Sequence, residues 1–259
     1  MNDLIQLKDK NIVIMGVSNE RSLAWGIAKT LHKAGANLIF TYRKERSYQK
    51  LIQLLEKENI EHTLTVACDV NEDDSLQQAF TKIGEEVNTI HGIVHAIAFA
   101  HGEDLHGDFV NTTRSGYAFA QDTSAYSLIA VAREAKPYLE AGSSIITMSA
   151  LGAERALDGY KVMGVAKAAL ESTCKYLALD LGEANIRINA ISAGPIRTLA
   201  AQGVPTFKQM LRDTKEKAPL KRNVTQEEVG NAALMLLSPL SSGITGEIVH
   251  VDAGYNIVG

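Results

Sequence analysis

Short apolar runs alternate along the chain with longer stretches in which apolar and polar residues recur at helical spacing. The runs predict buried strands, and the amphipathic stretches predict helices between them. We expect strands at 11–16, 37–42, 62–68, 92–99, 144–148, 187–192 and 247–251. We expect helices at 22–33, 44–58, 73–86, 114–139, 160–181, 206–216 and 225–237.

This alternation, with strands that are apolar throughout, predicts an α/β fold in which helices cover both faces of a parallel sheet. Right-handed crossovers then give a doubly wound, Rossmann-type sheet of about seven strands. The 259 residues contain no internal repeat, no low-complexity segment and no Pro/Gly/Ser-rich linker. We therefore expect residues 1–259 to form a single domain.

Composition excludes several classes of protein. Apolar residues make up 46% of the chain, and 26 basic residues stand against 30 acidic ones, so no basic excess points to nucleic acid. No apolar stretch approaches the roughly 20 residues of a membrane span, and the N-terminus has no secretory pattern. Cys68 and Cys174, the only cysteines, are expected to be reduced, buried thiols. Together these features predict a cytoplasmic protein.

The first predicted strand ends at Gly16, and Ser22 stands where it can cap the helix that follows. In a doubly wound sheet, this turn lies at the carboxyl edge, where a helix N-terminus offers free N–H groups to a phosphate. The usual G-x-G-x-x-G motif is absent, and one glycine in such a turn is also typical of a plain tight connection. The local pattern leaves both interpretations open.

The second predicted strand is followed by two cations, Arg43 and Lys44, and by no carboxylate. An acidic residue here would bond the ribose 2′-hydroxyl of NAD, whereas an arginine accommodates the 2′-phosphate of NADP. Cations at a helix N-terminus also oppose its dipole, which makes a merely solvated pair the weaker interpretation. We therefore expect NADPH in preference to NADH. Asp69 and Val70 are placed to hold the adenine, and Ile97 to lie beside the nicotinamide ribose.

Tyr160 and Lys167 lie seven residues apart on a predicted helix, which places both on one face, about 10 Å apart along the axis. A lysine there can hold ribose hydroxyls and lower the pKa of a nearby tyrosine through its charge. The tyrosine can donate a hydrogen bond to a carbonyl oxygen that gains negative charge. The same spacing also arises by chance, and Tyr160 as a plain core residue remains an open alternative.

Several blocks of the chain resemble the bacterial enoyl-acyl-carrier-protein reductases, a divergent branch of the short-chain dehydrogenases/reductases. The resemblance runs essentially end to end, and the blocks that carry it are 16–22, 40–46, 95–100, 160–168, 189–199 and 245–252. The wide Tyr160–Lys167 spacing and the block from Ala190 to Leu199 are typical of this branch. The resemblance implies reduction of the C2=C3 double bond of a trans-2-enoyl thioester on acyl carrier protein, with NAD(P)H, in fatty acid elongation.

The resemblance also assigns roles by position. Tyr160 would stabilise the enolate oxygen, and Lys167 would anchor the nicotinamide ribose. Ala100, Tyr160 and Met163 would contact the substrate. The cofactor would contact Gly16, Ser22, Leu23, Arg43, Lys44, Asp69, Val70, Ile97, Lys167, Ile196, Arg197, Thr198, Leu199 and Ala200. A homotetramer is implied, built through the two long helices at 114–139 and 160–181.

One position departs from the family pattern. The family carries a second tyrosine after the fifth strand, where this chain has Ala150, and the wider superfamily keeps its catalytic serine there. Alanine donates no side-chain hydrogen bond, and the adjacent Ser149 should point to the opposite face. Three alternatives stay open: Tyr160 suffices, the chain is another reductase such as a carbonyl reductase, or it is a weakly active or non-catalytic paralogue.

The segment 196–222 holds seven basic residues and only two acidic ones. Such a patch suits an acidic carrier protein, although a solvated helix face explains it equally well. Gly203 and Pro205 interrupt any periodicity, and we expect a substrate lid at about 196–216. The seven histidines form no H-E-x-x-H motif, and His91 and His95 are four apart on a strand, so no metal site is expected.

Overall fold

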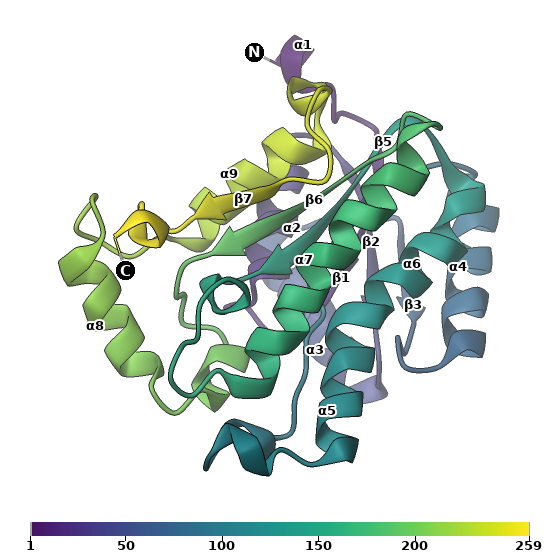
Figure 1. Ribbon diagram of the computed structural model, residues 1–259. Coiled ribbons are helices and arrows are strands. Elements are labelled where there is room, and N and C mark those ends of the chain that lie inside the picture. Colours follow the sequence, from purple (N-terminus) through teal and green to yellow (C-terminus); the bar gives the residue numbers. More distant parts are fainter. Residues whose placement is uncertain (1, 259) are drawn as a thin grey trace.

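The computed structural model describes residues 2–258, and Figure 1 shows a central sheet with helices on both sides. The sheet has seven strands in the order β3-β2-β1-β4-β5-β6-β7, and every neighbouring pair is parallel. The strands are β1 Asn11–Met15, β2 Asn37–Tyr42, β3 Leu64–Ala67, β4 Ile90–His95, β5 Leu139–Ser149, β6 Arg187–Ala193 and β7 Ile248–Val251. The predicted single-domain, doubly wound fold is confirmed.

The helices form two layers. They are α1 Asn2–Ile5, α2 Leu23–Lys33, α3 Glu45–Glu58, α4 Asp73–Val87, α5 Arg114–Gln121, α6 Ser127–Ala135, α7 Lys161–Gly182, α8 Phe207–Lys217 and α9 Gln226–Leu237. Because side chains alternate along a strand, Val13 and Met15 pack with α4, α6 and α7, while Ile12 and Ile14 pack with α2, α3 and α9. Burial on both faces explains why these strands are apolar at every position.

Two predicted elements, the strand 92–99 and the helix 114–139, end four residues earlier than expected. The fourth strand stops at His95 because the following segment leaves the sheet: both the N–H and the carbonyl of Phe99 bond to the Ser124 hydroxyl. The predicted helix 114–139 ends at Ala135, and a short 3₁₀ turn with Pro137 leads into β5. Proline has no N–H to donate, so it cannot continue the helix.

A π-helical turn, Asp122–Tyr126, separates α5 from α6. Its side chains reach the carboxyl ends of two strands. The Asn71 amide, after β3, donates to Asp122 at 2.9 Å and to Thr123 at 2.8 Å, and Ser124 holds Phe99 after β4. Turns of this kind are frequent at functional sites because the extra residue redirects side chains. Here the turn ties the helix layer to the edge of the sheet where the predicted site lies.

Gly16 ends β1 at the point where the strand order changes direction, between β1 and β4. Its φ is +98°, and a Cβ there would lie 2.1 Å from the Ala96 carbonyl oxygen. Only glycine fits both the conformation and the space. The crevice outside such a point is where doubly wound sheets bind their ligands.

Replacing Gly16 by alanine is expected to lower the free energy of unfolding by about 2–4 kcal/mol, since it adds backbone strain to a collision with backbone. Urea denaturation measures the change. Gly243→Ala is the matched control, because a Cβ at Gly243 meets no atom within 4 Å. Equal losses in the two variants would contradict this account of Gly16.

Candidate functional site

The residues predicted to bind a dinucleotide gather at one edge of the sheet. Gly16 follows β1, Arg43 follows β2, Asp69 follows β3, Ile97 follows β4 and Ile196 follows β6. All strands run in one direction, so these carboxyl ends lie along a single edge (Figure 1). The fold therefore brings together residues that are up to 180 positions apart in the sequence.

The N-terminus of α2 lies beside Gly16, and Leu23 is its first residue. The expectation that Ser22 caps this helix through its side chain is wrong. The Ser22 hydroxyl donates to the Asn19 carbonyl at 2.8 Å, and no side chain caps α2. The first N–H groups of the helix are thus left to a ligand, which is the arrangement that binds a phosphate.

The predicted adenosine end joins two strands. The Arg43 guanidinium, about half-exposed, lies 4.0 Å from the Asp69 carboxylate. Lys44 is exposed at the start of α3, and Val70 is buried. A cation directed along this edge, with a carboxylate beside it, offers a partner to a phosphate and one to a hydroxyl or amine.

The segment after β6 is predicted to close the nicotinamide end. Ile196 is partly buried against the core, while Arg197 and Leu199 are exposed. The Thr198 hydroxyl accepts from the Ala201 N–H at 3.0 Å and starts the 3₁₀ turn Ala200–Gly203. The side chain of Ala200 lies outside the described part of the chain.

Tyr160 precedes α7 instead of opening it, and Lys161 after it has a φ of +42°. The predicted helix start is therefore one residue too early. The ring rests on Gly152, where a Cβ would lie 2.1 Å from a ring carbon. Tyr160 packs with Ala100 and Met163 in one apolar cluster, so the structure brings the three predicted substrate residues together.

The expectation that Lys167 lowers the pKa of Tyr160 is wrong. Burial and the negative charge of Glu171 raise that pKa to about 12. The phenol therefore remains protonated at neutral pH and can donate a hydrogen bond. Its chemistry is that of a donor to an oxygen that becomes negative, the second of the two roles expected of it.

Lys167 is buried, with 5% of its surface exposed, and its ammonium donates to the Met148 carbonyl at 2.6 Å. Burial lowers its pKa to about 8, although Glu171 acts in the opposite direction. At neutral pH the side chain is a cation at the carboxyl end of β5. A charged donor in this place suits the hydroxyls of a ribose.

Ala150 directly follows β5 in extended conformation and supplies no donor. Ser149 does not replace it, because its hydroxyl donates to the buried carboxylate of Glu171 at 2.6 Å. The Ser149 hydroxyl thus contacts α7, the helix that also carries Lys167, and the expectation that it points away from the site stays a prediction. Sequence analysis missed Glu171, although a carboxylate four residues after Lys167 on one helix face was a signal.

His95 is fully buried at the end of β4, and it too was missed as part of the site's frame. Its ring nitrogens lie 2.9 Å from the hydroxyls of Thr147 and Ser127. Burial, and then the charge of Lys167, lower its pKa to about 3, so the ring is neutral. Its hydrogen bonds join β4, β5 and α6.

Within residues 2–258, no group of three or more His, Cys, Asp or Glu side chains could hold a metal ion.

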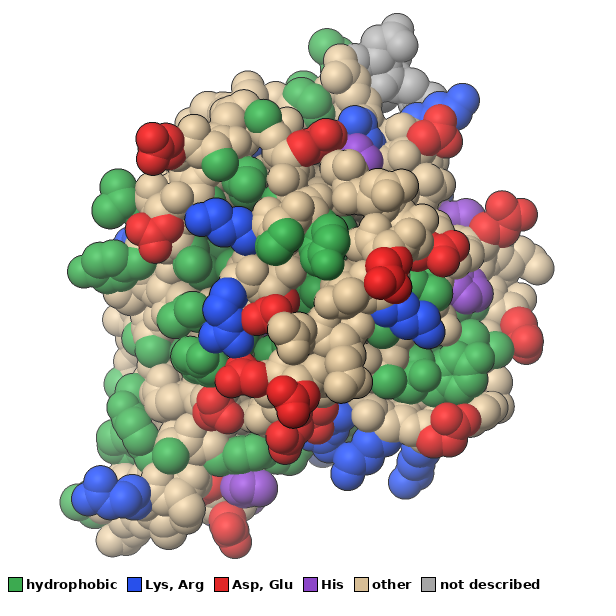
Figure 2. All heavy atoms as spheres, turned by 90° about the vertical axis from the view of Figure 1, so that its right-hand side faces the viewer, with side chains coloured by type: hydrophobic (Ala, Val, Ile, Leu, Met, Phe, Trp, Pro, Cys, Tyr) green, Lys and Arg blue, Asp and Glu red, His purple; other side chains and the backbone are tan. Residues whose placement is uncertain are grey.

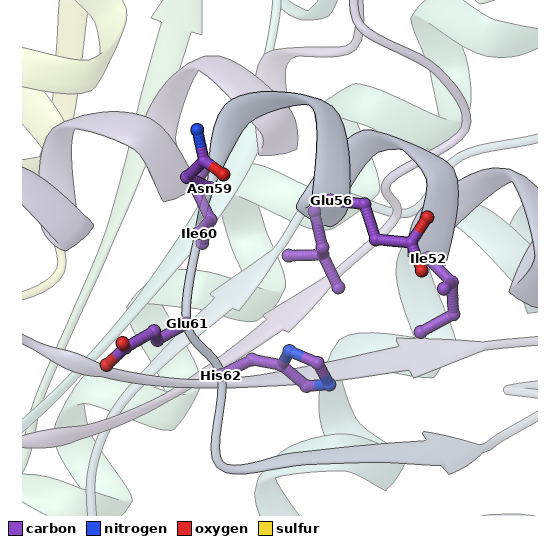
Figure 3. A pocket seen from close by; sticks show the side chains of 7 residues that line it. Ile52, Glu56, Asn59, Ile60, Glu61 and His62 are labelled. Atoms are coloured by element: carbon purple, nitrogen blue, oxygen red, sulfur yellow. The ribbon is translucent and has the colours of Figure 1, made fainter.

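Two hollows lie outside the predicted dinucleotide site. One of about 460 Å³ is bordered by Tyr160, Phe109 and the segment 152–161, and by none of the predicted cofactor residues. The other, of about 340 Å³, lies between the end of α3 and His62 (Figure 3). Its lining side chains come from α3 and the loop after it, and none belongs to the predicted site.

Basic and acidic side chains are both present on the surface, as expected from 26 basic and 30 acidic residues in the sequence. Figure 2 shows the face over α4 and α6, where acidic, basic and apolar side chains are interspersed. The predicted basic patch is exposed at every position, although Arg222 pairs with Glu228 at 2.6 Å. Its members are Arg197, Lys208, Arg212, Lys215, Lys217, Lys221 and Arg222. None of the described helices is both long and apolar enough to span a bilayer.

Comparison with known proteins shows which family this chain resembles in sequence and in structure. A family model described as enoyl-(acyl carrier protein) reductase matches residues 16–256. The enoyl-[acyl-carrier-protein] reductase [NADH] of Bacillus cereus is 54% identical, covering 98% of this chain and 99% of that protein. The enoyl-[acyl-carrier-protein] reductase [NADPH] of Staphylococcus aureus is 53% identical, and the match covers 98% of this chain and 100% of that protein. A crystal structure of the Bacillus cereus reductase with NADP⁺ and indole naphthyridinone superposes with a TM-score of 0.95, at 54% identity and 98% coverage of each chain.

Proposed function

This chain belongs to the enoyl-(acyl carrier protein) reductase family and is an NAD(P)H-dependent oxidoreductase, and we propose that it reduces the C2=C3 double bond of trans-2-enoyl thioesters in fatty acid elongation. The observation that carries the proposal is the presence, at one sheet edge, of both the protonated phenol of Tyr160 and the buried cation of Lys167.

The residues present fit a dinucleotide. Gly16 brings the backbone close to the crevice, the uncapped N-terminus of α2 faces a phosphate, and Lys167 offers a cation to the ribose. When bound, the nicotinamide supplies the hydride that C3 of the substrate accepts. The other predicted contacts, from Asp69 and Val70 to the segment 196–200, line the same edge.

Tyr160 would hold the thioester carbonyl oxygen by hydrogen bonding. As C3 gains hydride, negative charge develops on this oxygen, and a donor already in place stabilises the enolate more than the ground state. A pKa of about 12 keeps the proton on Tyr160 until that charge forms. Ala100 and Met163, packed beside the ring, would line the place of the acyl chain.

NADPH is the proposed cofactor, with NADH the weaker alternative. Similar relatives carry names with either one, so the preference has to come from this chain's own residues. Arg43 and Lys44 stand after β2, where a carboxylate would favour the free ribose hydroxyl. A guanidinium there gives a 2′-phosphate a charge-assisted, two-point contact.

The carrier-bound substrate would approach over the segment 196–216, which we propose as the lid. The Thr206 hydroxyl bonds to the Asp158 carbonyl at 2.5 Å, so this segment already touches the loop before Tyr160. The exposed basic residues from Arg197 to Arg222 suit an acidic carrier protein. We further propose a homotetramer through α5, α6, α7 and the π-helical turn between α5 and α6, whose exposed faces carry Tyr117, Tyr126, Ile129, Tyr176 and Leu179. We also propose a cytoplasmic site of action, where the buried thiols stay reduced.

Ala150 supports a second candidate, a weakly active or non-catalytic relative that binds the cofactor. Saturable NADPH binding without oxidation across a panel of enoyl thioesters would favour it. A carbonyl reductase would instead turn over ketones and leave enoyl thioesters unchanged. The absence of a hydroxyl at position 150 argues against that third alternative.

Tyr160→Phe is expected to lower kcat for crotonyl thioester reduction by on the order of 10²–10³-fold, since it removes the donor to the developing charge. NADPH consumption followed by absorbance measures the loss, and NADPH affinity should change less than about twofold. Tyr138→Phe, in the turn at the amino end of β5, is the control and should keep parental activity. Parental kcat in Tyr160→Phe would defeat the proposed role.

Arg43→Ala is expected to lower kcat/KM for NADPH about tenfold or more, because a charge-assisted bond to phosphate is worth roughly 1.5–3 kcal/mol. Activity with NADH should stay within about twofold. Arg46→Ala removes an exposed arginine from the first turn of the neighbouring α3 helix and serves as the control. An equal loss with both cofactors would speak against the 2′-phosphate role.

Ala150→Tyr is expected to change kcat/KM for enoyl thioesters by less than about threefold, since Tyr160 already supplies a donor to the oxygen. The same thioester panel, run with parent and variant, measures the effect. A gain above about tenfold would show that the parent lacks a needed hydroxyl and would favour the weakly active alternative.

A further inference from the structure

A buried carboxylate, Glu171, lies one helical turn after Lys167 on α7 and has no part in the roles proposed above. Only 8% of its surface is exposed. Side chains four residues apart share one face of a helix, so Lys167 and Glu171 are neighbours on the face that meets the end of β5.

Two consecutive residues of β5 each bind one member of this pair. The Lys167 ammonium donates to the Met148 carbonyl at 2.6 Å, and the Ser149 hydroxyl donates to the Glu171 carboxylate at 2.6 Å. A buried charge is costly unless an opposite charge and hydrogen bonds compensate it. The strand end fixes the geometry, and the two side chains supply the opposite charges.

Charged groups from other elements face Glu171. Glu154, after the turn that follows β5, and His250 of β7 both act on it, and their side chains lie 2.6 Å apart. Lys175 acts from its own helix, and Tyr160 lies within its influence. The Glu154 and His250 side chains are partly exposed, so solvent weakens their effect on Glu171.

The electrostatics of the pair are coupled. Burial raises the pKa of Glu171, and the Ser149 hydrogen bond lowers it; Glu154 adds to the first effect, while His250 and Lys175 add to the second. The charge of Glu171 in turn raises the pKa of Lys167 against the effect of burial. The neutral His95 ring, whose pKa the charge of Lys167 helps to lower, offers no counter-charge.

We propose that Glu171 is a positioning residue whose carboxylate, oriented by Ser149, keeps Lys167 a cation at the end of β5. The inference rests on the proposed cofactor role of Lys167. Without the Glu171 charge, the ammonium has no buried counter-charge and gives up its proton at lower pH. Affinity for the ribose of the cofactor is then lost in a range where the parent retains it.

The test is NADPH binding, followed by fluorescence between pH 6 and pH 10, to the parent and to Glu171→Gln. Both should bind alike near pH 6. The pH midpoint for loss of affinity should be lower by about one unit in Glu171→Gln, which corresponds to binding about tenfold weaker than the parent at pH 9. Ser149→Ala should move the midpoint part of the way, and Glu171→Asp, which keeps the charge, should return it toward the parent.

Asp180→Asn is the matched control, because it removes one negative charge from an exposed position of the same helix and should leave the parental midpoint unchanged. A shared midpoint for parent and Glu171→Gln, or an equal shift in Asp180→Asn, would overturn the inference. If Glu171→Gln does not fold by circular dichroism, Ser149→Ala decides, and an unshifted midpoint there overturns it as well. A parent that binds neither NADPH nor NADH at any pH defeats the proposed function instead.

Discussion

A sheet that is covered on both faces can present only the ends of its strands to a ligand. In this protein the layer of α2, α3 and α9 covers one face, and the layer of α4, α6 and α7 covers the other. All seven strands run in parallel, so the chain leaves the sheet repeatedly at the same edge. The chemistry that the fold allows is therefore concentrated there, and Gly16 opens the crevice at the point where the strand order changes direction.

Near this edge the interior holds several polar groups that water does not reach. His95, Lys167 and Glu171 are each at least nine-tenths buried, and each has a hydrogen-bond partner on β5 or α6. Burial is the largest influence on the protonation states of Tyr160, Lys167 and His95, and the charges of neighbouring groups modify it. The proton on Tyr160, the charge on Lys167 and the neutrality of His95 are thus properties of one packed assembly.

The buried groups determine what Ala150 means for the predicted site. A lost hydroxyl would matter least if the neighbouring serine were free to replace it, but the Ser149 hydroxyl is bonded to Glu171. The remaining donor to a substrate oxygen among the predicted catalytic residues is Tyr160, whose place depends on Gly152 beneath its ring. The proposed function would therefore depend on fewer side chains than the family pattern implies.

The sequence by itself determined the fold class, the burial of the strands on both faces and the sheet edge at which the predicted site lies. Hydrophobic periodicity indicates which faces of each element are covered. It also singled out Gly16, Arg43, Tyr160 and Lys167 as candidates, although the local patterns left Gly16 and Tyr160 open and the family resemblance supplied the proposed roles. Only the tertiary structure decided that the pKa of Tyr160 is raised, that Ser22 leaves its helix uncapped, and that Ser149 serves Glu171. These depend on burial and on distances between elements far apart in the chain, which periodicity along one element does not encode.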